Sequence, residues 1–432
     1  MSTSFPLSAA QRAVWRRHTQ DPSGHRQSTV RTFAVTGALD VAALRTAVEA
    51  LVRRHEPLRT VYLDGPVQQI RPDAPMAVRI VAGPPRPSAF DLARGPLLRV
   101  DVRPMGPNRH EVTFFVHLLA ADGWSLSVFF TDLAACYRAA LRGEPATLPD
   151  LAVQYVDWAA WQTRRLTRER TGELVHWWRG ALDGYGQLLE AGAGATTGEP
   201  GRGRRRAVAL DTGLVRAIGH LAAAHGNTTF TVLSAACAIA LTRRTGQDRV
   251  LLGLAVANRD RPEVAGVLGF FATLTVLPVD LTEDPAFGAL LGRVAEATAA
   301  TYQHRDLPLD EMAAALGCPD DPDAPDRMPW VQAVFAHHPA GSTGTLRLDG
   351  CEIAELPVPD TAKFALTVRV EDTVDGAATV WAEYDTARYR EPQIDSLLKA
   401  YQAVLRAVVA RPATRVSALR ALVPPLGGTF HG

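Results

Sequence analysis

The residues best suited to chemistry in this sequence lie in HLLAADGW, the stretch from His117 to Trp124. Histidine exchanges a proton near neutral pH more readily than any other side chain, and His117 ends an apolar run with the composition of a strand. Asp122 precedes an amphipathic run, where an aspartate caps a helix or holds a cation. A histidine between strand and helix predicts a sheet edge at which clefts form. The alternative is a buried histidine bonded to the backbone and an aspartate that only caps.

A second candidate is Arg59, in RRHEPLRTVY. Arginine pairs bidentately with carboxylates, so Arg59 could hold an active-site loop through an aspartate on a neighbouring element. The alternative is a surface arginine at a helix C-terminus, where the helix dipole favours a cation.

The third candidate is the pair His337 and His338, which ends the apolar run in VFAHHPAG. Adjacent residues of a strand point to opposite faces, so at most one of these histidines can face a given cleft. The alternative is that both are solvated residues at a strand end.

Aromatic residues are concentrated in YVDWAAWQ and HWWRGALDG, which contain Tyr155, Trp158, Trp161, Trp177 and Trp178. Aromatic density at helical spacing is typical of core packing. The alternative is a wall along which an extended substrate arm could lie.

The elements that must position these residues repeat in both halves of the chain. LDVAALRTAVEALVRRH has apolar residues at helical spacing behind the capping Asp40, and SLSVFFTDLAACYRAALRG ends at Gly143, a plausible helix stop. TVRTFAVTG, LLRVDVRPM and HEVTFFVH have the composition of strands. A second series follows a glycine-rich break, which predicts two α/β lobes over residues 1–184 and 207–432 and an interlobe loop over 185–206.

The composition favours a soluble globular protein. Of the 432 residues 47% are apolar and 21% charged, and the net charge of +1 gives no reason to expect nucleic acid or an anionic membrane as partner. The N-terminus lacks a signal-peptide pattern. The four cysteines are far apart in apolar contexts, as expected of free thiols in a reducing cytoplasm. No metal-ligand spacing, phosphate-binding glycine loop or GxSxG elbow occurs.

Seven stretches, in order between Leu7 and Asp372, together resemble the condensation domains of nonribosomal peptide synthetases. HLLAADG is similar to the family's HHxxxDG active-site motif, and RRHEPLRTVY matches its second motif almost residue for residue. The others are LSAAQRAVW, YVDWAAWQ, VANRDRPEVAGVLGFF, HRDLPLDEM and TAKFALTVRVED.

The resemblance implies two lobes related to chloramphenicol acetyltransferase, arranged as a V-shaped pseudo-dimer around a central tunnel. Two carrier proteins would deliver a donor thioester and an acceptor amine on their phosphopantetheine arms, and the amine would attack the thioester. It also implies a cytoplasmic, monomeric protein of antibiotic or other secondary metabolism, without a cofactor of its own. Trp124, Thr273 and Trp178 would line the tunnel.

The chain departs from the family at the active-site motif. The motif has two histidines, of which the second is held to act on the attacking amine. The first corresponds to His117 and the second to Leu118, whose side chain cannot accept a proton. Asp122 and Gly123 are kept, and so is Arg59, the family's usual salt-bridge partner for that aspartate. The resemblance therefore implies that the structural frame, with His117 pointing away from the tunnel, survives without the catalytic tip.

Further departures lie in the second half. Thr273 stands where the family has asparagine, and Pro278 where it often has arginine. The resemblance places His337 and His338 on a second-lobe strand facing the tunnel, where members often carry Gln-Asn. His338, at the asparagine position, is the favoured substitute for the base missing at Leu118.

Three functions remain open at this point. The first is a condensation-type acyl transferase that forms an amide or ester bond without the usual histidine, because positioning supplies much of the rate. The second is a catalytically degenerate module that binds carrier proteins or recruits a tailoring enzyme. The third is a condensation fold that runs a different reaction on a tethered substrate. The chain is expected to be either free-standing or a module excised from a larger synthetase.

Overall fold

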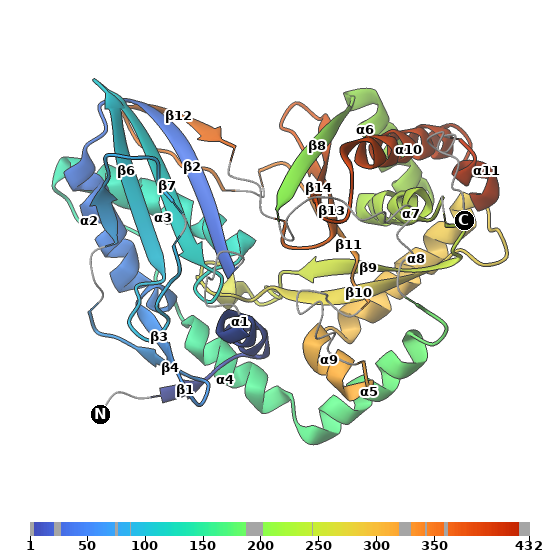
Figure 1. The fold of residues 1–432 in the computed structure, drawn as a ribbon, viewed down its shortest axis with the longest axis horizontal. Helices are drawn as coiled ribbons and strands as arrows, with labels where there is room; N and C mark the ends of the chain where they lie inside the picture. The colour runs from blue at the N-terminus through green and yellow to red at the C-terminus, as the bar shows by residue number, and fades with distance from the viewer. Residues whose placement is uncertain are drawn as a thin grey trace. The chain divides into compact units, whose positions relative to one another are not determined.

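The computed structural model describes residues 4–20, 27–73, 77–86, 88–186, 202–243, 245–318, 330–341, 344–357 and 362–422. The chain divides into two compact units, each built from helices and strands (Figure 1). Unit 1 comprises Met1–Thr167, Ala257–Ala272 and Ser342–Pro359, and unit 2 comprises Arg168–Val256, Thr273–Gly341 and Asp360–Gly432. The prediction of an α/β protein is confirmed.

The observed division differs from the predicted one. The first change of unit falls after Thr167 rather than after residue 184, and two later segments, Ala257–Ala272 and Ser342–Pro359, belong to unit 1. The prediction of a loop over residues 185–206 is wrong for its last part, because Gly203–Leu210 forms strand β8, which pairs with β14. Residues 187–201 of that predicted loop lie outside the described ranges. Local composition indicates turns, but it carries no information on which core a returning segment joins.

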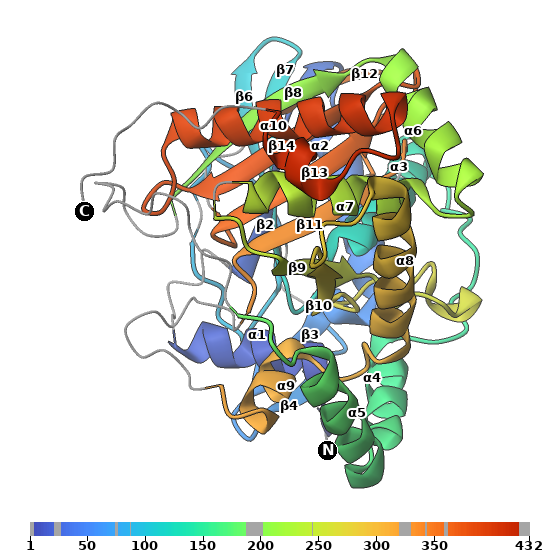
Figure 2. The same ribbon diagram turned by 90° about the vertical axis from the view of Figure 1, so that its right-hand side faces the viewer.

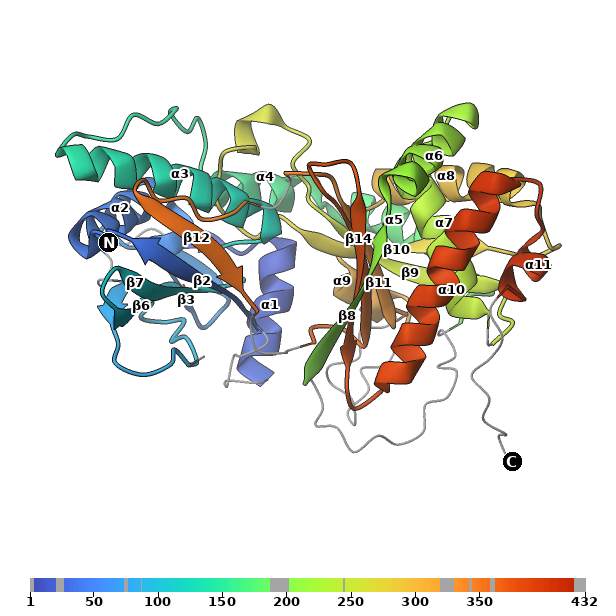
Figure 3. The same ribbon diagram turned by 90° about the horizontal axis from the view of Figure 1, so that it is seen from above.

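Unit 1 contains a five-stranded sheet with the order β12-β2-β7-β6-β5. Its strands are β2 (Ser28–Gly37), β5 (Val78–Ile80), β6 (Leu98–Gly106), β7 (Arg109–His117) and β12 (Cys351–Leu356). Helices α2 (Val41–Arg54) and α3 (Gly123–Arg142) cover one face (Figure 3). Alternate residues of β7, such as Phe114 and Val116, enter the core beneath them. The helix ends predicted from the sequence are present. Asp40 caps α2 by accepting a hydrogen bond from the Ala43 amide at 2.9 Å, and Gly143 ends α3 in a left-handed conformation.

The remaining elements of unit 1 include a three-stranded sheet with the order β1-β4-β3. They are the strands β1 (Ser4–Pro6), β3 (Thr60–Leu63) and β4 (Val67–Ile70), the helices α1 (Ala9–Gln20) and α4 (Tyr155–Arg165), and the 3₁₀ turns η2 (Glu56–Arg59) and η3 (Pro262–Val264). A separate small core joins α4 to the Ala257–Ala272 segment through Tyr155, Trp158 and Phe271. The aromatic residues of YVDWAAWQ therefore serve in packing.

Unit 2 contains a six-stranded sheet with the order β10-β9-β11-β13-β14-β8. Its strands are β8 (Gly203–Leu210), β9 (Arg249–Val256), β10 (Thr273–Asp280), β11 (Ala333–His338), β13 (Leu366–Asp372) and β14 (Ala378–Asp385). Its helices are α5 (Arg168–Ala181), α6 (Thr212–Ala224), α7 (Thr229–Thr242), α8 (Phe287–Gln303), α9 (Leu309–Ala315), α10 (Glu391–Ala410) and α11 (Val416–Arg420).

Helices α6, α7, α8 and α10 share one core with the six-stranded sheet (Figure 2). Helix α7 is apolar on all sides because the sheet and the other helices enclose it. On β11, Ala333 and Phe335 enter this core, so the even-numbered residues of the strand point to the opposite face. Among the described helices, none combines the length and apolarity that crossing a membrane requires.

Candidate functional site

The motif loop joins β7 to α3 within unit 1. His117 is the last residue of β7, Gly123 is the first of α3, and the residues between them are mostly buried. Asp122 is the N-cap of α3, and its Oδ1 accepts a hydrogen bond from the Ser125 amide at 2.7 Å. The cap satisfies one of the amides that a helix start leaves free.

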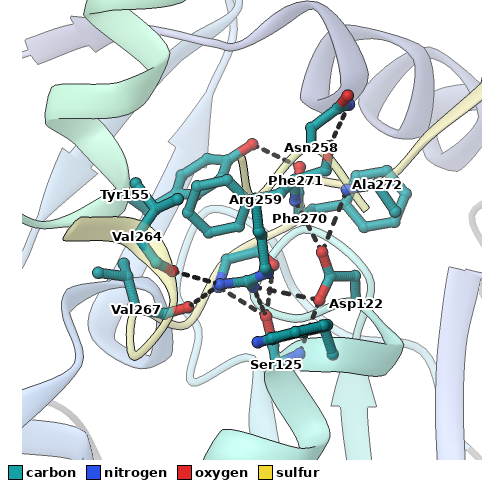
Figure 4. A network of polar contacts seen from close by, with 12 residues as sticks. Asp122, Ser125, Tyr155, Asn258, Arg259, Val264, Val267, Phe270, Phe271 and Ala272 are labelled. Carbon is teal, nitrogen blue, oxygen red and sulfur yellow. Dashed lines mark hydrogen bonds and ion pairs between the residues drawn. The ribbon is translucent and has the colours of Figure 1, made fainter. Parts of the chain in front are cut away.

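The Asp122 carboxylate also binds the Ala257–Ala272 segment (Figure 4). Its Oδ1 lies 3.3 Å from Arg259 Nη2, and both side chains are almost fully buried. Its Oδ2 accepts from two backbone amides, those of Phe271 at 3.0 Å and Ala272 at 3.1 Å. One carboxylate thereby links a helix start, a cation and a returning segment, and both of its oxygens are hydrogen-bonded.

Arg259 is held from several sides. Its Nη2 donates to Ser125 Oγ at 2.7 Å, and its guanidinium carbon lies 4.0 Å from the centre of the Phe271 ring. Its Nη1 donates to two backbone carbonyls, those of Val264 at 2.6 Å and Val267 at 2.8 Å. Burial lowers the pKa of Arg259 and Asp122 opposes that shift.

The predicted salt bridge between Asp122 and Arg59 is wrong. Arg59 ends η2, where its Nη2 lies 3.7 Å from Glu56 and its Nη1 donates to the Arg71 carbonyl at 2.7 Å. The partner of Asp122 is Arg259, which stands 137 residues later in the chain. The order of motifs cannot show which of several arginines reaches a carboxylate. The sequence pointed to Arg259 only in that this residue lies within the motif VANRDRPEVAGVLGFF.

Tyr155 anchors the same segment from α4. Its hydroxyl donates to the Phe270 carbonyl at 2.6 Å and lies 2.8 Å from Ser8 Oγ. Its ring lies against Gly269, where an added Cβ would come within 1.9 Å of a ring carbon. Burial raises the pKa of Tyr155 well above its ordinary value, so the phenol stays protonated. No local pattern in the sequence predicts this contact between Tyr155 and Gly269, which lie 114 residues apart.

His117 is fully buried. Its Nδ1 accepts a hydrogen bond from the Leu119 amide at 3.2 Å, which assigns the proton to Nε2, and Nε2 lies 3.3 Å from His18 Nδ1. Burial, and then the neighbouring His18, lower the pKa of His117 to about 3. These contacts support the structural interpretation of His117 as a neutral ring that fixes the loop.

The burial of His117 predicts a pH-dependent stability. Above its ordinary pKa of 6.5 the ring is neutral in both states, and its contribution is fully present. As the pH falls below 6.5 the unfolded chain binds a proton that the folded chain excludes until about pH 3, so stability declines by up to about 1.4 kcal/mol per pH unit. Urea unfolding from pH 7.5 to 5 measures this slope.

The variant His117→Gln should flatten the pH dependence of stability, whereas the same change at the exposed His176 should leave it unchanged. Equal slopes in both variants would contradict the assignment of this pH dependence to the burial of His117.

Leu118 occupies the position of the missing base. Its side chain is half-buried against the core of unit 1, and its amide donates to the Gln27 carbonyl at 2.8 Å. It therefore contributes packing and no proton-transfer group.

The three residues expected to line a tunnel have different environments. Trp124 is 47% exposed, and its indole N–H donates to the Ala265 carbonyl at 3.1 Å. Thr273 is buried at the start of β10. Trp178 is fully buried, and its indole N–H donates to the His304 carbonyl at 3.0 Å within unit 2. The burial of Trp178 favours the packing interpretation of its aromatic cluster.

His337 and His338 end β11 in unit 2 and point to opposite faces of the sheet. His337 lies on the helix-covered face, and its Nε2 lies 3.0 Å from Asp372 Oδ2. His338 lies on the other face, with its side chain 38% exposed and its Nδ1 4.0 Å from Glu371 Oε1. Burial, followed by Arg369, lowers the pKa of His338, so its ring is neutral at pH 7.

The described ranges hold no cluster of three or more histidine, cysteine, aspartate or glutamate residues that could bind a metal ion. At the motif loop both oxygens of Asp122 are occupied by Arg259 and backbone amides, and burial lowers the pKa of His117. His338 in unit 2 has a partly exposed ring and is the remaining candidate for proton transfer.

Comparison with known proteins adds a family match over most of the chain. The family model described as condensation domain matches residues 1–424. Chondramide synthase cmdD of Chondromyces crocatus is 30% identical over 95% of this chain and 11% of that protein. Phosphinothricin tripeptide synthetase PhsC of Streptomyces viridochromogenes is 31% identical over 96% of this chain and 40% of that protein. The chain thus spans less than half the length of these relatives.

Solved structures agree in fold. The X-domain from teicoplanin biosynthesis, in its complex with OxyB, is 25% identical with a TM-score of 0.86, and the match covers 98% of this chain and 97% of that one. The first condensation domain of the calcium-dependent antibiotic synthetase, with a substrate analogue, is 20% identical with a TM-score of 0.77 over 96% and 98% of the two chains.

Proposed function

The chain belongs to the condensation-domain family, and we propose that it is a condensation-type acyl transferase acting on carrier-bound substrates. It would join a donor thioester to an acceptor amine or hydroxyl, each delivered on the phosphopantetheine arm of a carrier protein, in the biosynthesis of a nonribosomal peptide. The observation that carries the proposal is the complete frame around Asp122 and Arg259, in which every oxygen of the motif aspartate is bonded although the motif's second histidine is absent.

The reaction needs one proton acceptor and one proton donor. The acceptor nitrogen or oxygen attacks the thioester carbonyl, its bond to carbon forms, and the carbon–sulfur bond breaks. A base takes the proton of the nucleophile and then donates it to the departing thiolate. We assign the acceptance of that proton to His338, because its ring is neutral and partly exposed. Positioning of the two arms supplies a further share of the rate.

A second candidate function is recruitment of a tailoring enzyme to a carrier-bound peptide. Two observations favour it: Leu118 removes the motif's base, and the similar X-domain has been solved in complex with OxyB. In this case His338 would have no effect on chemistry, and the protein would bind carriers without forming product.

The distinguishing experiment combines the protein with loaded donor and acceptor carriers and follows the acceptor carrier by intact mass. We expect a mass increase equal to the donor acyl group. His338→Ala should lower turnover about 100-fold or more, the range for loss of a general base, with carrier binding unchanged. His337→Ala is the matched control, since its ring lies on the other face, and should keep turnover within about threefold.

Leu118→His supplies a further arm of this experiment. The surrounding motif also differs at Thr273 and Pro278, so the variant should not become an efficient ligase for ordinary aminoacyl carriers. Binding of both carriers with no product from the parent protein contradicts the transferase proposal and favours recruitment. Unchanged turnover in His338→Ala removes the base assignment while leaving the transferase intact.

A further inference from the structure

Two strands of unit 2 bring a histidine, a glutamate and an arginine together on the face away from the helices. β11 pairs in parallel with β13, and His338 stands opposite Glu371 in the register. Arg369 lies two positions earlier on β13 and points to the same face. Glu371 Oε1 lies 2.8 Å from Arg369 Nε and 4.0 Å from His338 Nδ1.

Both of these nitrogens lack a satisfactory partner. His338 Nδ1 and Arg369 Nε are buried atoms without a hydrogen bond to any described residue, although Arg369 Nε is close to the carboxylate. Buried polar groups in folded proteins are nearly always hydrogen-bonded. The Glu371 carboxylate faces both nitrogens, at 2.8 Å from Arg369 Nε and 4.0 Å from His338 Nδ1, and its side chain is 30% exposed.

The neighbouring pair shows the opposite arrangement. Asp372 meets His337 at Nε2, at 3.0 Å, whereas Glu371 faces the Nδ1 side of His338. A carboxylate fixes the imidazole tautomer because it accepts the proton of the nitrogen that it faces. The two adjacent carboxylates of β13 therefore face different ring nitrogens of the two histidines.

We propose that Glu371 is a positioning residue that holds His338 with its proton on Nδ1 and leaves the Nε2 lone pair at the exposed edge of the ring. A base needs this free lone pair to take the proton of a nucleophile. The catalytic consequence rests on the proposed role of His338, whereas the tautomer preference does not.

Arg369 opposes Glu371 in this arrangement. The charged and titratable groups that act on His338 are Arg369 and Glu371 from β13 and His337 from its own strand. Beyond the effect of burial, Arg369 and His337 lower the pKa of His338 and Glu371 raises it. Removal of Glu371 should therefore lower the pKa of His338, whereas removal of Arg369 should raise it.

The test is nitrogen-15 NMR of the full chain with ring-labelled histidine, in which the His338 signals are identified by their loss in His338→Ala. In the parent protein the neutral ring should be mainly the Nδ1–H form. Glu371→Gln keeps the size of the side chain and should lower the ratio of Nδ1–H to Nε2–H by about tenfold, with a fall in the apparent pKa of His338. Asp372→Asn, the matched control, should alter only the His337 signals.

Arg369→Met provides an independent arm, since it frees Glu371 and should raise both the Nδ1–H fraction and the pKa of His338. The inference fails if Glu371→Gln leaves the His338 tautomer unchanged, if Asp372→Asn changes it equally, or if Arg369→Met shifts it in the same direction as Glu371→Gln.

Turnover with loaded carriers then separates this inference from the function. Glu371→Gln should lower turnover about tenfold and move the acidic limb of the pH profile to lower pH, because the pKa of the base falls. A shifted tautomer with unchanged turnover in His338→Ala confirms the positioning and removes the catalytic role. An unchanged tautomer with strongly reduced turnover in His338→Ala removes the positioning and leaves the role of His338.

Discussion

Replacing Arg259 by methionine should destabilise the protein by about 3–5 kcal/mol, the cost of leaving a buried charge without its partner. Methionine preserves much of the volume, so the loss reports the charge and its hydrogen bonds. Asp122 would keep its contacts with the amides of Phe271 and Ala272 but lose its buried cation. Urea unfolding of the full chain, followed by tryptophan fluorescence, measures the change.

Arg59→Met is the matched control. Arg59 pairs with Glu56 at 3.7 Å near the surface, and pairs of this kind contribute about 0–1 kcal/mol. The midpoint of unfolding should therefore move little. If Arg59→Met is as destabilising as Arg259→Met, the assignment of Arg259 as the partner of Asp122 is contradicted.

Gly269→Ala should be nearly as damaging, at about 3 kcal/mol, because overpacking in a rigid core forces backbone movement. The new Cβ would lie 1.9 Å from the Tyr155 ring, far inside van der Waals contact, and the φ of +157° is itself rarely adopted by other residues. The Tyr155 ring cannot retreat easily, since its hydroxyl bonds the Phe270 carbonyl and its neighbours are Trp158 and Phe271.

Gly266→Ala is the control within the same segment. A Cβ there would meet only Leu151, at an ordinary 3.6 Å, and the residue is exposed. Its unfolding midpoint should stay within about 0.5 kcal/mol of the parent protein, as for most surface changes. Equal effects of the two substitutions would show that the segment tolerates a side chain at Gly269 and that the close packing on Tyr155 is not a constraint.

Substitutions at Arg259 and Gly269 also test whether the proposed transfer reaction depends on a rigid motif loop. Arg259 and Gly269 both hold the segment that supplies two amides to Asp122, and Asp122 starts the helix that follows the motif loop. Partial loss of turnover in either variant, with carrier binding retained, would indicate that the loop must be rigid for transfer. In that case Asp122 would affect turnover by holding the loop in place, since Arg259 and backbone amides occupy both of its oxygens.

Much of the local structure could be predicted from the sequence because it depends on neighbours along the chain. Asp40 and Asp122 cap the helices that their spacing predicts, and Gly143 ends α3 in a left-handed conformation. The apolar run before the motif placed β7 and its terminal His117 correctly. The α/β class followed from the same periodicity, and the order of seven motifs indicated the family.

The partners of these residues required the tertiary structure. Arg59 and Arg259 are equally good partners for a carboxylate by chemistry, and only the return of the Ala257–Ala272 segment to unit 1 decides between them. The pairing of His338 with Glu371 depends on the parallel register of β11 and β13, which no local pattern encodes. Long-range contacts depend on how segments pack around a shared core, so the sequence determined the elements and their ends, and the fold decided which charges meet.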